Sequence, residues 1–267
     1  MSEVTIPPVT PPSLASTGPE RYGRVVSPIY LARAPGKISH LGSGVLVQST
    51  EGHWLFTAAH VLADKIHGKI LLPGVPDFFT PINNVVSSCE LLPGIAQRDR
   101  IDMSYLALTE DEAKLLQNGG ARFLPATNDT FEPNGITPYP GIGTITGYPN
   151  SAVQIEGREI NVHLTNLLNM KFASHERLRR AGFDPEITIG LIRHQKEFLD
   201  RRRLHKLELR GLSGGAIWAH HSSGARLVGI FTEYHSNRSL LIGTRLKPLV
   251  MELARRLKQL QTGQALD

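Results

Sequence analysis

The sequence predicts an all-β protein made of many short antiparallel strands, with helices confined to two stretches. Two observations support this class: short apolar runs are separated by Gly, Pro and Ser, and 40% of the residues are hydrophobic, which is enough for a sizeable core. The length of 267 residues fits one ordinary domain, or two small ones that share a cleft. We therefore expect a sandwich or barrel architecture.

The strands are expected from Tyr22 onward. Residues 1–20 hold five of the 18 prolines and have no periodic apolar pattern, so they predict an extended, disordered tail. Ser49–Gly52 has the length of a hairpin connection. The expected strands are 25–26, 43–48, 53–57, 69–72, 105–108, 143–147, 159–163, 215–218, 226–232 and 240–244.

Two stretches interrupt the strands with helical signals. Asp184 followed by Pro185 resembles a helix start, and it predicts one or two helices within an insertion spanning about residues 170–206. Near the C-terminus, leucines recur at helical spacing from Leu246 to Leu260 and Gly263 follows. We therefore expect an amphipathic helix within residues 246–267.

The net charge of +5 is concentrated in the insertion. Between Lys171 and Arg210 there are eleven Lys and Arg against six Asp and Glu, which accounts for the whole excess. Few aromatic residues and no zinc-ligand spacing accompany these charges, so a surface for a regulatory protein is favoured over a nucleic-acid site. Nucleic acid stays open as the less favoured partner.

Composition also argues against several other classes. The sequence has no run approaching eighteen apolar residues and no basic segment followed by an apolar run at its start, so we expect neither a membrane span nor a secretory signal. The single cysteine, Cys89, excludes an internal disulfide. The histidines lack companions at metal-ligand spacing, and no glycine-rich phosphate loop follows a strand. We expect a cytoplasmic protein with no metal and no cofactor.

Three segments together supply the parts of an acyl-transfer site. They place His60 after a strand, Asp102 before an apolar strand and Ser213 in a glycine-rich turn. A serine hydroxyl needs a nearby base to act as a nucleophile, histidine can take and return its proton, and a carboxylate can orient the ring. Glycines let the amides of Gly211 and Ser213 approach a developing oxyanion.

Asp99 is the competing acid for this site. Its neighbours lack the apolar alternation that follows Asp102, so Asp102 is preferred.

These segments carry a family resemblance. The runs Phe-Thr-Ala-Ala-His-Val at 56–61, Asp-x-Ser-x-Leu at 102–106 and Gly-x-Ser-Gly-Gly at 211–215 resemble the chymotrypsin/trypsin-like serine peptidases, in the family's order of His, Asp and Ser. The lack of disulfides and of a signal segment is similar to intracellular bacterial members. The resemblance spans about residues 22–262.

The resemblance implies two antiparallel six-stranded β-barrels of the chymotrypsin type, with the helical basic insertion and the C-terminal helix added. The first barrel would span residues 21–125 and carry His60 and Asp102, and the second would span 126–245 and carry Ser213. Secreted relatives have an aspartate before the serine that pairs with a new N-terminus. Leu212 stands there in this chain, so activation by N-terminal insertion is not expected.

The resemblance also implies which residues contact the substrate. Leu207 and Glu208 would line the primary specificity pocket, and Thr232, Glu233 and Tyr234 would form the strand opposite. Leu207 stands where trypsin-like members hold a carboxylate, and Glu208 could replace that charge and attract a basic side chain. Alternatively, Glu208 pairs with an arginine and the pocket prefers a small apolar residue.

Two functions are therefore expected from the sequence. The first is a trypsin-like serine endopeptidase that acts on protein or peptide substrates. For it, the resemblance implies a role as a regulated effector in a bacterial stress or antiphage pathway. The second is a catalytically silent binding module that keeps the fold and acts through the basic insertion.

Overall fold

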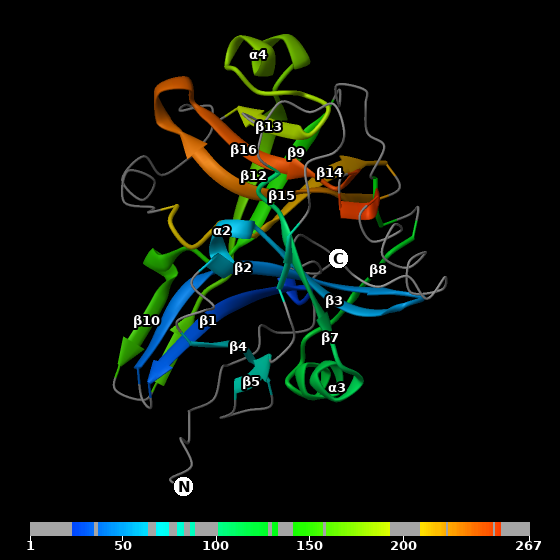
Figure 1. Ribbon diagram of the computed structural model, residues 1–267. Coiled ribbons are helices and arrows are strands. Elements are labelled where there is room, and N and C mark those ends of the chain that lie inside the picture. The colour runs from blue at the N-terminus through cyan, green and yellow to red at the C-terminus, as the bar shows by residue number, and fades with distance from the viewer. Residues whose placement is uncertain are drawn as a thin grey trace, which may run out of the picture.

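The computed structural model describes residues 23–34, 37–63, 68–74, 79–82, 86–88, 101–127, 130–132, 141–156, 159–192, 209–222, 224–247 and 249–251. These residues form two β units with few helices, the two-barrel all-β architecture of the chymotrypsin type. Figure 1 shows the blue and cyan strands of the first unit below the green-to-orange strands of the second, with α2 near their junction. Within this described part, no helix has the length and apolar character needed to cross a membrane.

The first unit is an eight-stranded sheet in the order β5-β4-β1-β2-β3-β7-β6, with β8 paired to β2. The hairpin expected at Ser49–Gly52 joins β2 to β3, and Ser49 pairs with Gly52. The strands are β1 (Val26–Ala34), β2 (Lys37–Ser49), β3 (Gly52–Thr57), β4 (Lys69–Pro73), β5 (Phe79–Ile82), β6 (Val86–Ser88), β7 (Ser104–Leu108) and β8 (Leu124–Pro125). The unit thus has two more strands than the six expected.

The second unit is a closed six-stranded barrel in the order β12-β13-β16-β15-β14-β9. A separate hairpin of β10 and β11 packs against the first unit, where β10 lies beside the blue strands (Figure 1). The strands are β9 (Ile142–Gly147), β10 (Val153–Glu156), β11 (Glu159–Val162), β12 (Thr165–Phe172), β13 (Thr188–Ile192), β14 (Ala216–His221), β15 (Gly224–His235) and β16 (Leu240–Arg245). Short 3₁₀ turns lie at Asn150–Ala152 and Ser236–Arg238.

Of the one or two helices expected within the insertion, the structure describes α4 (His175–Arg180). The helix start expected at Asp184 was wrong, because turn and strand residues follow it through Ile192. Asp184 instead closes a local turn: its Oδ1 accepts the Glu186 N–H at 2.9 Å and its carbonyl accepts the Thr188 N–H at 2.8 Å. The chain then enters β13, which is almost wholly buried between the barrel interior and α4 (His175–Arg180). A strand covered on both faces is apolar throughout, so it cannot be told from a helix by periodicity alone.

Helix α3 (Glu110–Asn118) was not expected from the sequence. It begins with a capping box, in which the Thr109 hydroxyl accepts the Glu112 N–H at 3.2 Å and the Glu112 carboxylate accepts the Thr109 N–H at 2.8 Å. Thr-x-x-Glu before an apolar residue is a signal for such a start, and it could have predicted this helix.

Several expected segments fall outside the described residues. They are the tail at 1–20, Cys89, the competing acid Asp99, Leu207 and Glu208, the later part of the insertion at 193–206, and residues 252–267 of the expected C-terminal helix. Of the expected C-terminal helix, Lys247 and Leu249–Met251 are helical, and Leu246 and Leu249 are fully buried.

One apolar cluster joins the two units. It combines side chains of the first unit, including Val45, Phe56 and Tyr105, with side chains of the second, including Trp218 and Leu227. Trp218 is buried and its Nε1 donates to Thr146 Oγ1 at 3.1 Å. Burial of large apolar side chains between the units stabilises their relative position, so residues from both can form one site.

Candidate active site

His60 lies where the first unit turns from a strand into a helix. Strand β3 ends at Thr57, whose hydroxyl donates to the Ser43 carbonyl at 2.7 Å, and α2 (Ala59–Leu62) begins two residues later. The fully buried Ala58 fits this tight junction because its side chain is small. The His60 side chain remains half exposed, so a substrate can reach it.

Asp102 precedes β7 and binds the start of α2 through both carboxylate oxygens. Its Oδ2 lies 2.7 Å from His60 Nδ1, and its Oδ1 accepts the His60 backbone N–H at 3.1 Å. Burial alone would raise the pKa of Asp102, but the hydrogen bond and charge of His60, with the amides of Ala59 and His60, bring this pKa below its ordinary value. The carboxylate is therefore ionised near neutral pH.

This contact gives the His60 ring a definite orientation. With the proton on Nδ1 donated to Asp102, Nε2 is the ring atom that can take up a proton. The hydrogen bond to Asp102 raises the pKa of His60 above its ordinary value, partial burial opposes the rise, and the charges of Asp102 and Glu233 add to it. The ring is therefore a stronger base than histidine in water.

Ser213 lies on a tight glycine turn that leads into β14. Gly211 and Gly214 have φ angles of +84° and +86°, in the left-handed region. A Cβ at Gly214 would lie 1.8 Å from the Ser43 carbonyl oxygen, and one at Gly211 would lie 2.2 Å from Asn150 Oδ1. Glycine is required at both positions because the conformation and the space exclude a side chain.

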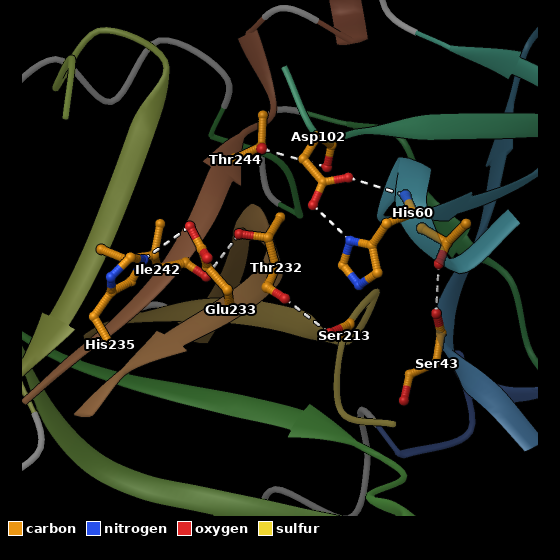
Figure 2. A network of polar contacts seen from close by, with 10 residues as sticks. Ser43, His60, Asp102, Ser213, Thr232, Glu233, His235, Ile242 and Thr244 are labelled. Atoms are coloured by element: carbon orange, nitrogen blue, oxygen red, sulfur yellow. Dashed lines mark hydrogen bonds and ion pairs between the residues drawn. The ribbon is translucent and has the colours of Figure 1, made fainter. Parts of the chain in front are cut away.

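The Ser213 hydroxyl donates to the Thr232 carbonyl at 2.7 Å. A hydroxyl has one proton to donate, and among the described residues no hydrogen bond joins Ser213 to His60. Figure 2 shows the His60 ring between Asp102 and the Ser213 turn. The structure thus brings His60, Asp102 and Ser213 into one site, with the hydroxyl turned toward the second unit.

The peptide groups of the turn have fixed directions. The Arg210 carbonyl accepts the Asn150 N–H at 2.6 Å, and the Leu212 carbonyl accepts the Gly215 N–H at 2.9 Å. The described residues contain no cis peptide bond, and in a trans peptide the N–H points away from the C=O. The N–H groups of Gly211 and Ser213 belong to the same two peptides as these carbonyls. Each N–H is therefore held pointing away from the group that binds the carbonyl of its peptide.

Strand β15 supplies the expected substrate-side residues that the structure describes. The pairing of β15 with β16 is irregular between Phe231 and Glu233, and such a bulge can redirect a backbone group. Thr232 is buried at this bulge, Tyr234 is half-buried, and Glu233 is exposed with its Oε1 2.9 Å from His235 Nε2. Pairing of β15 with β14 ends at Ile230, whereas its pairing with β16 continues through His235.

Leu212 is fully buried in the apolar core of the second unit, with Ile145 and Ile217. Apolar packing therefore anchors the turn through the residue that precedes Ser213.

Three residues that support the Ser213 turn were not expected from the sequence: Ser43, His40 and Asn150. His40 Nδ1 lies 2.7 Å from Asn150 Oδ1, and burial is the main reason why the pKa of His40 is lowered. The glycines that flank Ser43 are the one signal that could have marked it, because glycine within a strand indicates close approach of another backbone.

Comparison with known proteins agrees on the fold. No family model matches the chain, and no curated protein matches it. The solved structure of GrC, granzyme C, a chymotrypsin-fold serine protease, is similar with a TM-score of 0.54 and 13% sequence identity, over 95% of this chain and 98% of that chain. At this identity the likeness shows the trypsin-like fold alone. The fold therefore defines a class to which serine proteases belong, and activity has to be argued from the site.

Proposed function

We propose that this protein is a trypsin-like serine endopeptidase with Ser213 as nucleophile, His60 as general acid and base, and Asp102 as the orienting acid. The observation that carries the proposal is the 2.7 Å contact between His60 and Asp102, which leaves Nε2 as the basic atom beside the glycine turn of Ser213. A change of Ser213 rotamer would redirect its hydroxyl from Thr232 to that atom.

The reaction would follow the acyl-enzyme route. Ser213 Oγ bonds to the scissile carbonyl carbon while His60 Nε2 takes its proton, and the amides of Gly211 and Ser213 bind the oxyanion. His60 then gives the proton to the amine nitrogen as the C–N bond breaks. Water, deprotonated by His60, hydrolyses the acyl ester and releases the acid. No cofactor takes part in these steps.

The substrate would be an extended peptide paired with the Thr232–His235 segment as an added strand. The exposed carboxylate of Glu233 in this segment supports recognition of a basic side chain. Glu208 at the primary pocket is the second proposed source of that preference, and a small apolar residue before the cut is the alternative. A peptide library without enrichment of Lys or Arg would select the alternative.

A fluorophosphonate probe tests the proposal directly. We expect the wild-type chain to gain one probe mass on Ser213, and Ser213→Ala and His60→Ala to gain none. The labelled chain should also lose its peptidase activity. An intact, folded wild-type protein that neither labels nor cleaves a peptide library would reject the enzyme.

The alternative is a catalytically silent module that acts through its basic surface. It is supported by the Ser213 hydroxyl donating to Thr232, and by the exposed Arg179 and Arg180 on α4. Deleting residues 174–203 would be a poor test because β13 belongs to the barrel. Arg179→Glu with Arg180→Glu changes exposed residues of α4, including the ion pair of Arg180 with Glu176. Loss of partner binding in this variant, together with a wild-type chain that neither labels nor cleaves, would assign the function to this surface.

We also propose a cytoplasmic, regulated effector role, since α4 offers a regulator a basic surface apart from the site. A comparison of cellular cleavage products between wild-type and Ser213→Ala would test this role.

A further inference from the structure

Ser43 on β2 contacts the turn that carries Ser213 from the first unit. It is fully buried, and both its hydroxyl and its backbone are hydrogen-bonded. Its backbone N–H donates to the Ser213 carbonyl at 2.8 Å, and its carbonyl accepts the Thr57 hydroxyl at 2.7 Å. Figure 2 shows Ser43 across the Ser213 turn from Thr232.

The hydroxyl of Ser43 joins two segments of the second unit. It donates to the Gly211 carbonyl at 2.9 Å and accepts the Tyr148 N–H at 2.8 Å. Two residues after Tyr148, the Asn150 N–H holds the Arg210 carbonyl. One side-chain oxygen therefore connects the Ser213 turn to the segment that orients the Arg210–Gly211 peptide.

The peptide that Ser43 binds lies between the two proposed oxyanion donors. The Gly211 amide belongs to the peptide before it, and the Ser213 amide belongs to the peptide after it. Rotation of the Gly211–Leu212 peptide would change the directions of both neighbouring amides, because adjacent peptides share a Cα. Gly211 has the conformational freedom to permit that rotation, since it has no side chain. The Ser43 hydroxyl opposes it.

The geometry points to Ser43 as a positioning residue for the proposed hydrolysis, whose hydroxyl holds the amides of Gly211 and Ser213 in the directions that bind an oxyanion. This inference rests on the proposed function. The Ser43 hydrogen bond also fixes the turn without an ion pair. The residue before Ser213 is Leu212, which has no charge and is buried in the core.

Removal of the hydroxyl should affect the transition state more than substrate binding. In Ser43→Ala, the Gly211 carbonyl and the Tyr148 N–H lose a hydrogen-bond partner while the chain path is kept. Loss of a single oxyanion donor lowers kcat about 10²–10³-fold in related chemistry, so misdirected donors should lower it about 10–100-fold. Binding of the peptide along β15 does not use this hydroxyl, so KM should change less than twofold.

The experiment compares wild-type, Ser43→Ala, Ser43→Cys and Ser27→Ala at a temperature where all four are folded. Ser27 is a matched control because it is also buried in the first unit and, among the described residues, its hydroxyl bonds only the next carbonyl, that of Pro28. The readouts are kcat, KM and inhibition by a peptide aldehyde, whose adduct with Ser213 places an oxygen in the oxyanion site.

We expect Ser43→Ala to lose kcat and aldehyde affinity in parallel by at least tenfold, with KM preserved. Ser43→Cys should fall between wild-type and Ser43→Ala because a thiol is a weak donor, and Ser27→Ala should match wild-type. If the wild-type protein is active and Ser43→Ala keeps the same kcat and aldehyde affinity, the inference about Ser43 is overturned but the proposed function is not. The same holds if KM rises in Ser43→Ala by the same factor by which kcat falls. A wild-type chain inactive toward peptide and probe would overturn the proposed function and this inference together.

Discussion

At the scale of single residues, two acidic side chains act on His60: one sets the orientation of its ring, and both affect its pKa. Asp102 orients the ring through Nδ1, and Glu233 acts on it through charge from β15. Both acidic residues favour the protonated ring, but only Asp102 is hydrogen-bonded to it. Their replacement should therefore have different kinetic effects.

Asp102→Asn should lower kcat by about 10⁴-fold, because an amide can donate to Nδ1 and so favour the wrong tautomer. The matched control is Asp99→Asn, which changes the other acid in this part of the sequence and should retain wild-type kcat. The measurement is kcat for hydrolysis of one peptide by the wild-type protein and by both variants. A large loss in Asp99→Asn with little loss in Asp102→Asn would reverse the assignment.

The pH dependence of kcat/KM should reflect the raised pKa of His60. Only the neutral ring accepts the serine proton, so activity should rise with pH through an apparent pKa above the ordinary histidine value of 6.5. In Glu233→Gln the protonated ring loses one supporting charge, so this limb should move to lower pH. A pH–rate profile that is identical in Glu233→Gln would show that the Glu233 charge does not act on the ring.

At the scale of elements, two left-handed glycines can be compared: Gly214 in the Ser213 turn and Gly182 in the turn after α4. Gly214 and Gly182 have nearly the same φ, +86° and +82°, but only Gly214 faces atoms of another element. At Gly182 nothing lies within 4 Å of the position of an added Cβ, whereas at Gly214 the Ser43 carbonyl lies 1.8 Å away. The pair therefore separates backbone strain from close packing.

Gly182→Ala should destabilise the protein by about 1–2 kcal/mol, the cost of a left-handed residue with a side chain. Gly214→Ala should cost about 3 kcal/mol or more, because β2 and the turn must also move apart. Guanidinium unfolding of both variants measures the difference. Equal destabilisation would mean that the turn can leave β2 without further cost, and that the contact through Ser43 is not tight.

At the scale of the whole molecule, one apolar cluster connects the two β units, and the site lies where they meet. Each unit has one of the two tryptophans, Trp54 in the first and Trp218 in the second, and both pack in the shared cluster. Unfolding of either unit would expose apolar side chains of the other. The two units should therefore unfold together.

Fluorescence of Trp218 in Trp54→Phe, and of Trp54 in Trp218→Phe, should follow the same guanidinium midpoint as far-UV circular dichroism of the same variant. Comparing two signals within each variant removes the effect of the substitution on stability. A fluorescence midpoint separated from the circular dichroism midpoint would indicate that one unit unfolds alone.

The amino-acid sequence did not predict β5, β6, β8, β10, β12 or β13. It predicted the other ten described strands, several of them with limits that were too short, and the three segments with the chemistry of acyl transfer. These features are local: alternation, turn residues and short motifs depend on a few neighbouring positions. The same local patterns predicted a helix where β13 lies. Strand β13 is buried on both faces, by the barrel interior and by α4, so its residues show no alternation of apolar and polar positions. It also missed α3, although Thr109 and Glu112 carry its capping signal.

How the distant segments support one another depends on three-dimensional packing. The pairing of His60 with Asp102, the direction of the Ser213 hydroxyl and the role of Ser43 join residues that are 42, 19 and 168 positions apart. A hydrogen bond depends on distances of a few tenths of an ångström, and such distances are set by packing of the two β units against a shared core. No periodicity along the chain encodes them.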